Sequence, residues 1–301
     1  MIGPLFALLS ALCFATASAS IAKGAGQTSG DNGAFLSVVM TLIVAGTLWL
    51  LLGNPLGSFD RALAIGAVYF ALSGVLSTVV GRLTLFRSVE LAGAIQASLF
   101  RRLTPLFGAV FAFVILGETV GYLGVAGMAV VLASLFLVIA IKAEANPFEI
   151  RGDDVATTHR GQVFGTLSAG SYGASYVARK LGMMYVPDPT LGTFVGALSG
   201  LLFYGIAMPV NRRFRAAICG VFRNTGRWQL LAAALISFGQ VAQFFALINT
   251  GVAVVAIIGS LEVFLSIYVA AYIFKSEPPP GIRVVVASTV ATIGVILFAL
   301  D

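Results

Sequence analysis

The sequence has little charge and few of the side chains on which most enzyme chemistry depends. Only 10% of its 301 residues are charged, and it contains one histidine and two cysteines. His159 alone cannot provide the cluster of ligands that a metal site requires, and it does not favour a serine–histidine hydrolase inside a membrane. The sequence has no GxxxxGK[ST] phosphate-binding loop and no dinucleotide-binding glycine fingerprint at the start of a helix. We therefore expect no enzyme, no catalytic residue, no metal and no cofactor.

The net charge and the two cysteines bear on the partners and the disulfides to expect. The net charge of +6 is typical of cytoplasmic loops in a membrane protein, and the basic residues do not cluster as in a nucleic-acid-binding patch. We therefore expect no nucleic-acid partner. Cys13 lies in the first hydrophobic run and Cys219 in a basic loop, so a disulfide between them is not expected.

Apolar residues make up most of the chain. Hydrophobic residues account for 59% of it, and the mean hydropathy is +1.00. Because a soluble domain cannot bury so much apolar surface, we expect a polytopic membrane protein with the lipid bilayer as its solvent. The location that we predict is the cell inner (plasma) membrane. The N-terminal "MIGPLFALLSALCFATASASIAKG" has no basic n-region, so we interpret it as the first membrane helix and not as a cleaved signal.

Ten segments are long and apolar enough to cross a bilayer, which takes about 20 residues in a helix. The predicted fold class is therefore an all-α integral membrane protein with ten transmembrane helices. The segments are 2–22, 33–52, 61–87, 91–116, 120–141, 162–180, 190–210, 228–248, 251–274 and 283–300.

The two halves of the chain resemble each other. "SALCFATASASIAKGA" (10–25) aligns with "SAGSYGASYVARKLGM" (168–183), and "AGAIQASLFRRLTPLFGAVFAFVILGE" (92–118) aligns with "GVAVVAIIGSLEVFLSIYVAAYIFKSE" (251–277). We predict two five-helix repeats, residues 1–141 and 161–301, joined by a linker over 142–160. Because five is odd, the repeats have opposite orientations in the membrane. Inverted repeats are typical of secondary transporters that bind substrate near the bilayer midplane.

The distribution of Lys and Arg predicts the orientation. Of the 18 basic residues, 12 fall in loops on one side, three (Arg61, Arg179 and Lys180) on the other, and three inside segments. By the positive-inside rule, the 142–160 linker and the 211–227 loop are cytoplasmic and both termini lie outside. The 211–227 loop mixes basic and apolar residues, which is typical of a segment lying along the membrane surface.

Three charged residues lie deep in predicted segments, where each costs about 3 kcal/mol or more. Glu262 is the deep carboxylate of the ninth segment, and Arg101 and Arg102 lie together in the fourth. In the repeat alignment Glu262 matches Leu103, next to Arg102. Either these residues form a structural ion pair or at least one of them contacts substrate. Pro105 lacks the N–H that would bond the Arg101 carbonyl, so we expect that carbonyl to be free at membrane depth.

Other polar residues recur at helical spacing and are candidates to line a cavity. They could equally form ordinary interhelical hydrogen bonds, which are common in membrane bundles. Together with the three deep charges, the candidate substrate-binding residues are Ser168, Tyr172 and Tyr176 in the sixth segment, Gln240 and Gln243 in the eighth, and Thr78 and Arg82 in the third.

The stretch "FALINTGVAVVAIIGSLEVFLSIYVAAYIFKSE" (245–277) and its fainter copy "LFRSVELAGAIQASLFRRLTPLFGAVFAFVILGE" (85–118) resemble the EamA family of the drug/metabolite transporter superfamily. The resemblance implies a basket of helices around a central cavity lined by helices one, three, four, six, eight and nine. It also implies export of amino acids or related metabolites, closest to the aromatic-amino-acid exporter type. Family members often carry "LEP" in the ninth helix; here it is "LEV", so Glu262 carries over and the proline does not.

The resulting functional prediction is a secondary transporter, monomeric or homodimeric, that exports a small metabolite by alternating access. Two alternatives stay open at this point. One is an integral-membrane enzyme, which the missing motifs disfavour. The other is a channel or a membrane protein that transports nothing, which an inverted repeat disfavours.

Overall fold

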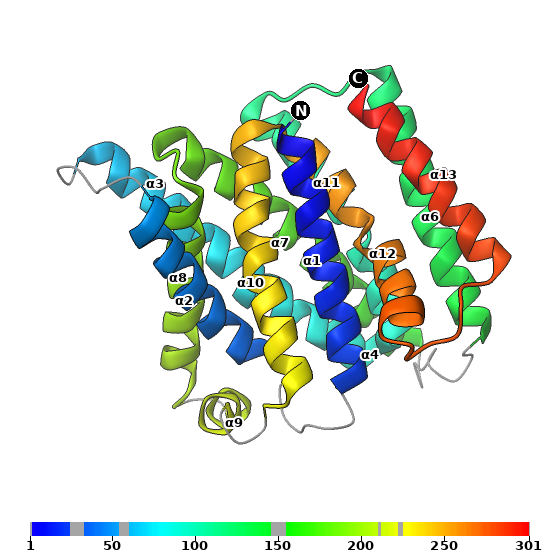
Figure 1. The fold of residues 1–301 in the computed structure, drawn as a ribbon, viewed down its shortest axis with the longest axis horizontal. Coiled ribbons are helices and arrows are strands. Elements are labelled where there is room, and N and C mark those ends of the chain that lie inside the picture. Colours follow the sequence, from blue (N-terminus) through cyan, green and yellow to red (C-terminus); the bar gives the residue numbers. More distant parts are fainter. Residues whose placement is uncertain are drawn as a thin grey trace. The chain divides into compact units, whose positions relative to one another are not determined.

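The computed structural model describes residues 2–24, 33–53, 60–145, 155–209, 212–221 and 225–300. Over these ranges the chain is helical and has no strand (Figure 1). The predicted all-α membrane class is confirmed. Nine segments of the described chain are long and apolar enough to span a bilayer: Ile2–Gly24, Ala34–Leu52, Arg61–Gly93, Gln96–Leu116, Tyr122–Ile141, Pro189–Ala207, Arg227–Asn249, Val252–Ile273 and Ile282–Ala299.

The predicted sixth segment lies inside a longer and more polar helix, α7 (Val155–Tyr185). With 31 residues at about 1.5 Å each, α7 exceeds the roughly 30 Å of a bilayer's hydrocarbon core. Its serines and basic residues keep its hydropathy below that of the nine apolar spans. A tenth span and the opposite orientation of two repeats stay predictions.

The helices form two compact units, and each unit takes helices from both halves of the sequence. The predicted division into two five-helix repeats joined by a linker over 142–160 stays a prediction. The first unit comprises Met1–Val75, Ala178–Thr250 and Glu262–Pro279, and the second comprises Leu76–Val177, Gly251–Leu261 and Pro280–Asp301.

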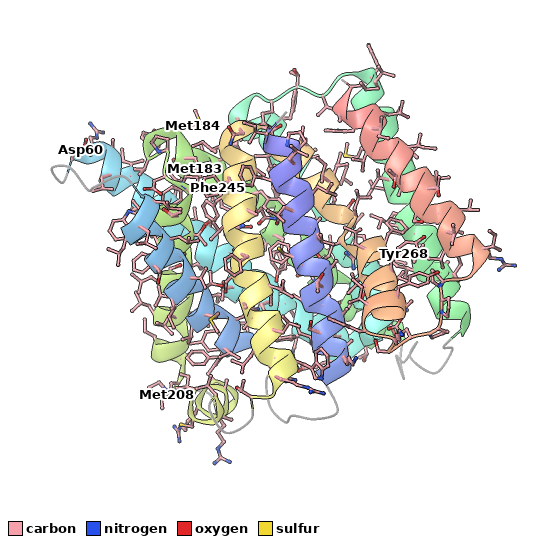
Figure 2. All side chains as sticks on the ribbon, viewed as in Figure 1. Asp60, Met183, Met184, Met208, Phe245 and Tyr268 are labelled. Atoms are coloured by element: carbon pink, nitrogen blue, oxygen red, sulfur yellow. The ribbon has the colours of Figure 1, made fainter. Side chains whose placement is uncertain are left out.

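The first unit is organised around the pair α1 and α10, which lie side by side (Figure 1). The Ser10 hydroxyl donates to the Gly239 carbonyl at 2.8 Å, and Phe6 stacks on Phe245 with ring centroids 5.2 Å apart. Figure 2 labels Phe245 on α10. Besides the end of α7, its elements are α1 (Ile2–Gly24), α2 (Ala34–Leu52), α3 (Arg61–Gly74), α8 (Pro189–Ala207), α9 (Arg212–Gly220), α10 (Arg227–Asn249), α12 (Glu262–Tyr268) and the π-helical turn η5 (Val269–Ile273).

The second unit contains the closely packed pair α6 and α13 (Figure 1). A Cβ on Gly127 would lie 2.4 Å from the Gly294 carbonyl oxygen, so this contact requires glycine. Besides the start of α7, its elements are the π-helical turn η2 (Val75–Gly81) from Leu76 onward, α4 (Arg82–Arg101), α5 (Thr104–Phe111), the π-helical turn η3 (Ala112–Leu116), α6 (Tyr122–Ala145), α11 (Val252–Ser260) and α13 (Ile282–Ala299).

The boundary expected between the third and fourth segments, at 87–91, is wrong. Arg87 and Glu90 stay helical and form a surface salt bridge of 2.9 Å. The helix is instead interrupted at Gly93, which has φ 84°, a conformation that other residues rarely adopt. Arg87 and Glu90 therefore lie on the surface of a continuous helix, and the interruption occurs at Gly93.

The fourth and ninth segments share a backbone pattern. In the first, the amide of Arg102 bonds the Leu99 carbonyl at 3.2 Å, and in the second, that of Leu261 bonds the Ile258 carbonyl at 3.1 Å. Leu261 stands opposite Arg102 in the alignment of 92–118 with 251–277. Each segment then passes through a π-helical turn and ends at a left-handed residue, Gly117 (φ 69°) or Lys275 (φ 50°). The likeness is local, and the repeat of five-helix units stays a prediction.

Candidate substrate site at two helix breaks

The three deep charged residues lie at the two helix breaks. Arg101 is the last residue of α4 and Arg102 is its C-cap, whereas Glu262 is the first residue of α12. A helix dipole favours a cation at its C-terminal end and an anion at its N-terminal end. Each charge therefore lies at the half-helix end that stabilises it, which lowers the cost of placing it in a membrane segment.

Glu262 lies in the first unit and interacts there with α1. Its Oε1 accepts a hydrogen bond from the Ser18 hydroxyl at 3.0 Å. Glu262 is half-buried and Ser18 is exposed, so the carboxylate is not fully enclosed by the described residues. Ser18 was missed from the sequence because "ATASAS" resembles ordinary small-residue packing; its place on the first helix, which the resemblance puts at the cavity, was the available signal.

Arg101 and Tyr172 are brought together in the second unit. The guanidinium carbon of Arg101 lies 5.2 Å from the centroid of the Tyr172 ring, within cation–π range. A Cβ on Gly81 would lie 3.0 Å from the same ring, so glycine lets the tyrosine approach η2. Two candidates that were separate in the sequence are thus neighbours.

The carbonyl oxygen of Arg101 is not free, contrary to expectation. The Thr104 hydroxyl donates a hydrogen bond to it at 2.7 Å. Pro105 does remove one helical N–H, but a threonine three residues after Arg101 can reach its carbonyl through the side chain. The break is therefore satisfied locally and does not by itself offer a carbonyl to a ligand.

Ser168 has a structural partner. It is fully buried, and its hydroxyl donates to the Gly81 carbonyl at 2.7 Å, while the nearby Ser171 donates to the Leu76 carbonyl at 2.7 Å. Both acceptors belong to η2, where the wider π-helical turn disturbs the regular pairing of carbonyls. The serine face of α7 therefore holds α7 against η2.

Gln240 and Gln243 bind the side chain of Arg179. The Arg179 guanidinium donates to Oε1 of Gln243 and to Oε1 of Gln240, the latter at 3.1 Å. It also lies 5.0 Å from the Phe244 ring centroid. Arg179 is only 4% exposed, so its assignment to an outer loop is wrong. Basic residues near a segment end were counted as loop because the true helix runs on to Tyr185.

The remaining candidates belong to the second unit. Thr78 is half-buried in η2, and Arg82 is half-buried at the start of α4. Tyr176 packs on α5, where a Cβ on Gly108 would lie 3.8 Å from its ring. A role in substrate binding stays a prediction for all ten candidates.

Comparisons with known proteins agree with the all-helical membrane fold. Residues 1–140 match the EamA-like transporter family. A solved crystal structure shares the fold with a TM-score of 0.71 at 16% sequence identity, covering 99% of this chain and 96% of that one. A search of curated proteins found no match.

Proposed function

We propose that this multi-pass membrane protein, whose residues 1–140 match the EamA-like transporter family, is a secondary transporter that exports amino acids or closely related metabolites. We further propose that it works by alternating access in the cell inner membrane. Its 142–160 linker and 211–227 loop would be cytoplasmic and its termini outside. The family match supports transport in general, and the substrate class rests on the chemistry of the helix breaks.

The observation that carries the proposal is the position of charge at two interrupted segments. Transporters commonly bind substrates and ions where membrane helices are discontinuous, since half-helix ends present oriented dipoles at membrane depth. Here one break carries Arg101 and Arg102, and the corresponding break of the ninth segment carries Glu262. Intramembrane charges are costly and are retained chiefly for function.

These charges suit a zwitterion. A guanidinium at the first break can bind a carboxylate through two parallel hydrogen bonds. Tyr172, which lies beside Arg101, adds a ring face that can bind a cationic or aromatic group. In the first unit, the carboxylate of Glu262, which accepts a hydrogen bond from Ser18, can also accept hydrogen bonds from an ammonium group. Each unit, taken by itself, thus offers a partner for one of the two charged groups of an amino acid.

Counterflow in proteoliposomes tests the function. Purified protein is reconstituted in vesicles preloaded with one unlabelled solute from a panel of amino acids, their amides and the corresponding amines, and uptake of the labelled solute is followed. A transporter gives transient accumulation above equilibrium that depends on internal substrate. Uptake that only equilibrates would indicate a channel, and no uptake of any panel member would reject the proposed substrate class.

A further inference from the structure

The short helix α9 presents a single-sign face. Residues 189–261 contain no Asp or Glu, whereas five arginines fall between positions 212 and 227. Arg212 and Arg215 on α9 and Arg227 at the start of α10 are exposed. Within the described chain, the Arg215 guanidinium donates a hydrogen bond to the Pro209 carbonyl at 3.3 Å. No carboxylate of this 73-residue stretch can neutralise these cations, because the stretch has none.

The opposite face of α9 is fixed to the first unit. Phe214 packs edge-on against Phe203 and Tyr204 of α8, with ring centroids 5.7 and 5.2 Å away. Ala217 is buried in a cluster that includes Phe35 and Val38 of α2. These contacts hold α9 at one end of α2 and α8 and fix the direction in which its arginines project.

The orientation of α9 differs from that of its neighbours. In Figure 1, α9 is seen end-on, while α2, α8 and α10 run along the page. Since α2, α8 and α10 are membrane spans by length and composition, α9 runs along the plane of the bilayer at their ends. Amphipathic helices in this position place basic side chains at the level of the lipid headgroups.

We propose that α9 and the start of α10 form a binding surface for anionic phospholipid headgroups, made by Arg212, Arg215 and Arg227. Charge complementarity selects the ligand, because clustered basic residues next to a membrane span attract anionic lipids. Trp228 adds an interfacial anchor beside this surface: its ring lies 5.1 Å from the Arg227 guanidinium carbon and 4.5 Å from Lys23 Nζ. The inference requires only membrane insertion and is independent of what the protein transports.

The two tryptophans of the chain provide a probe and a control. Trp228 adjoins the arginine surface, whereas Trp49 packs on Phe194 near the other end of α2. Trp49 is fourteen residues after Phe35, or about 21 Å along the helix. A Trp49→Phe protein therefore reports lipid near α9, and a Trp228→Phe protein reports lipid far from it.

The experiment measures tryptophan quenching in the full chain, reconstituted in phosphatidylcholine with brominated phosphatidylglycerol or brominated phosphatidylcholine as the quencher. We expect Trp228 to report a preference for phosphatidylglycerol on the order of ten- to a hundredfold, and Trp49 to report almost none. The triple change Arg212→Gln, Arg215→Gln and Arg227→Gln should abolish the preference, and the same positions changed to Lys should keep it.

A charge-matched control removes three exposed arginines elsewhere, by Arg61→Gln, Arg160→Gln and Arg283→Gln, and should leave the preference at Trp228 intact. Equal preference at Trp228 and Trp49 overturns the proposal, as does a preference that survives the glutamine changes or disappears in the control. If the glutamine variant fails to fold, the comparison of Trp228 with Trp49 in the chain with all its arginines still decides.

Discussion

Ser18 on α1 donates a hydrogen bond to the carboxylate of Glu262 at the start of α12, with the two oxygens 3.0 Å apart. This bond links the first membrane helix to the break in the ninth. Ser18 is exposed and Glu262 is only half-buried. Within the first unit the carboxylate is therefore not hidden in a core, which suits the proposed role in binding.

We predict that Glu262→Gln leaves the protein folded and impairs transport. The glutamine carbonyl can still accept from Ser18, so the free energy of unfolding should change by about 1 kcal/mol or less. Loss of the charge should reduce transport by about tenfold or more. Thermal unfolding in detergent and counterflow in liposomes measure the two effects.

Glu277→Gln is the matched control, since Glu277 is exposed at the end of the same segment and should affect neither quantity. A stability loss of about 3–5 kcal/mol in Glu262→Gln would indicate a buried ion pair instead. A Glu262→Gln protein with normal stability and normal transport would remove Glu262 from both accounts.

We predict that Arg179→Ala destabilises the fold by about 2–4 kcal/mol. The change removes hydrogen bonds from a charged donor to Gln240 and Gln243, and it removes packing on Phe244. Arg179→Lys should not rescue fully, because an ammonium cannot reproduce the planar fork that reaches both glutamines. Unfolding by detergent titration measures the loss, and Arg61→Ala, at an exposed position on α3, should change stability by less than about 0.5 kcal/mol.

Two buried serines make a matched pair. Ser168 bonds the Gly81 carbonyl, so Ser168→Ala should leave that carbonyl poorly satisfied and cost about 1–2 kcal/mol. Ser88 is equally buried, but its hydroxyl has no hydrogen-bond partner among the described residues. Ser88→Ala should therefore be neutral or stabilising. Equal losses of thermal stability in the two variants would show that the π-helical turn does not depend on Ser168.

Helix positions followed from the sequence where hydrophobic runs ended in loops. The expected 33–52 and 228–248 differ by one residue at each changed end from Ala34–Leu52 and Arg227–Asn249. The sequence failed where a boundary is conformational and not compositional. The break at Gly93 depends on a positive φ, and the length of α7 depends on tertiary bonds made by its polar residues.

The candidate site was predictable only in part. Deep charges are visible in a sequence because the membrane makes them expensive, so Arg101, Arg102 and Glu262 could be selected. Their position at helix breaks could not, because it depends on short turns at Arg102 and Leu261. Partners such as Ser18 for Glu262, and Arg179 for Gln240 and Gln243, come from segments far apart in the chain. Such contacts depend on tertiary packing and cannot be predicted from one sequence.

We predict that α9 faces the cytoplasm, as the distribution of basic residues indicates. Cys219 is a free, exposed thiol on α9, and Cys13→Ser leaves it as the single cysteine. It is a better probe than a cysteine at Ala217, which is buried. On intact cells, Cys219 should react with a membrane-permeant maleimide and resist an impermeant one. Rapid labelling by the impermeant reagent would reverse the orientation.

The most direct test of the account is competition by an amino acid and by its amide against a labelled substrate, in wild type, Arg101→Gln and Arg102→Gln. A guanidinium–carboxylate contact is worth about 1.5–3 kcal/mol, so at least one variant should lose about ten- to a hundredfold of the preference for the acid over the amide. If the acid is preferred over the amide to the same extent in all three proteins, the arginines at the helix break do not recognise substrate, and the central claim fails.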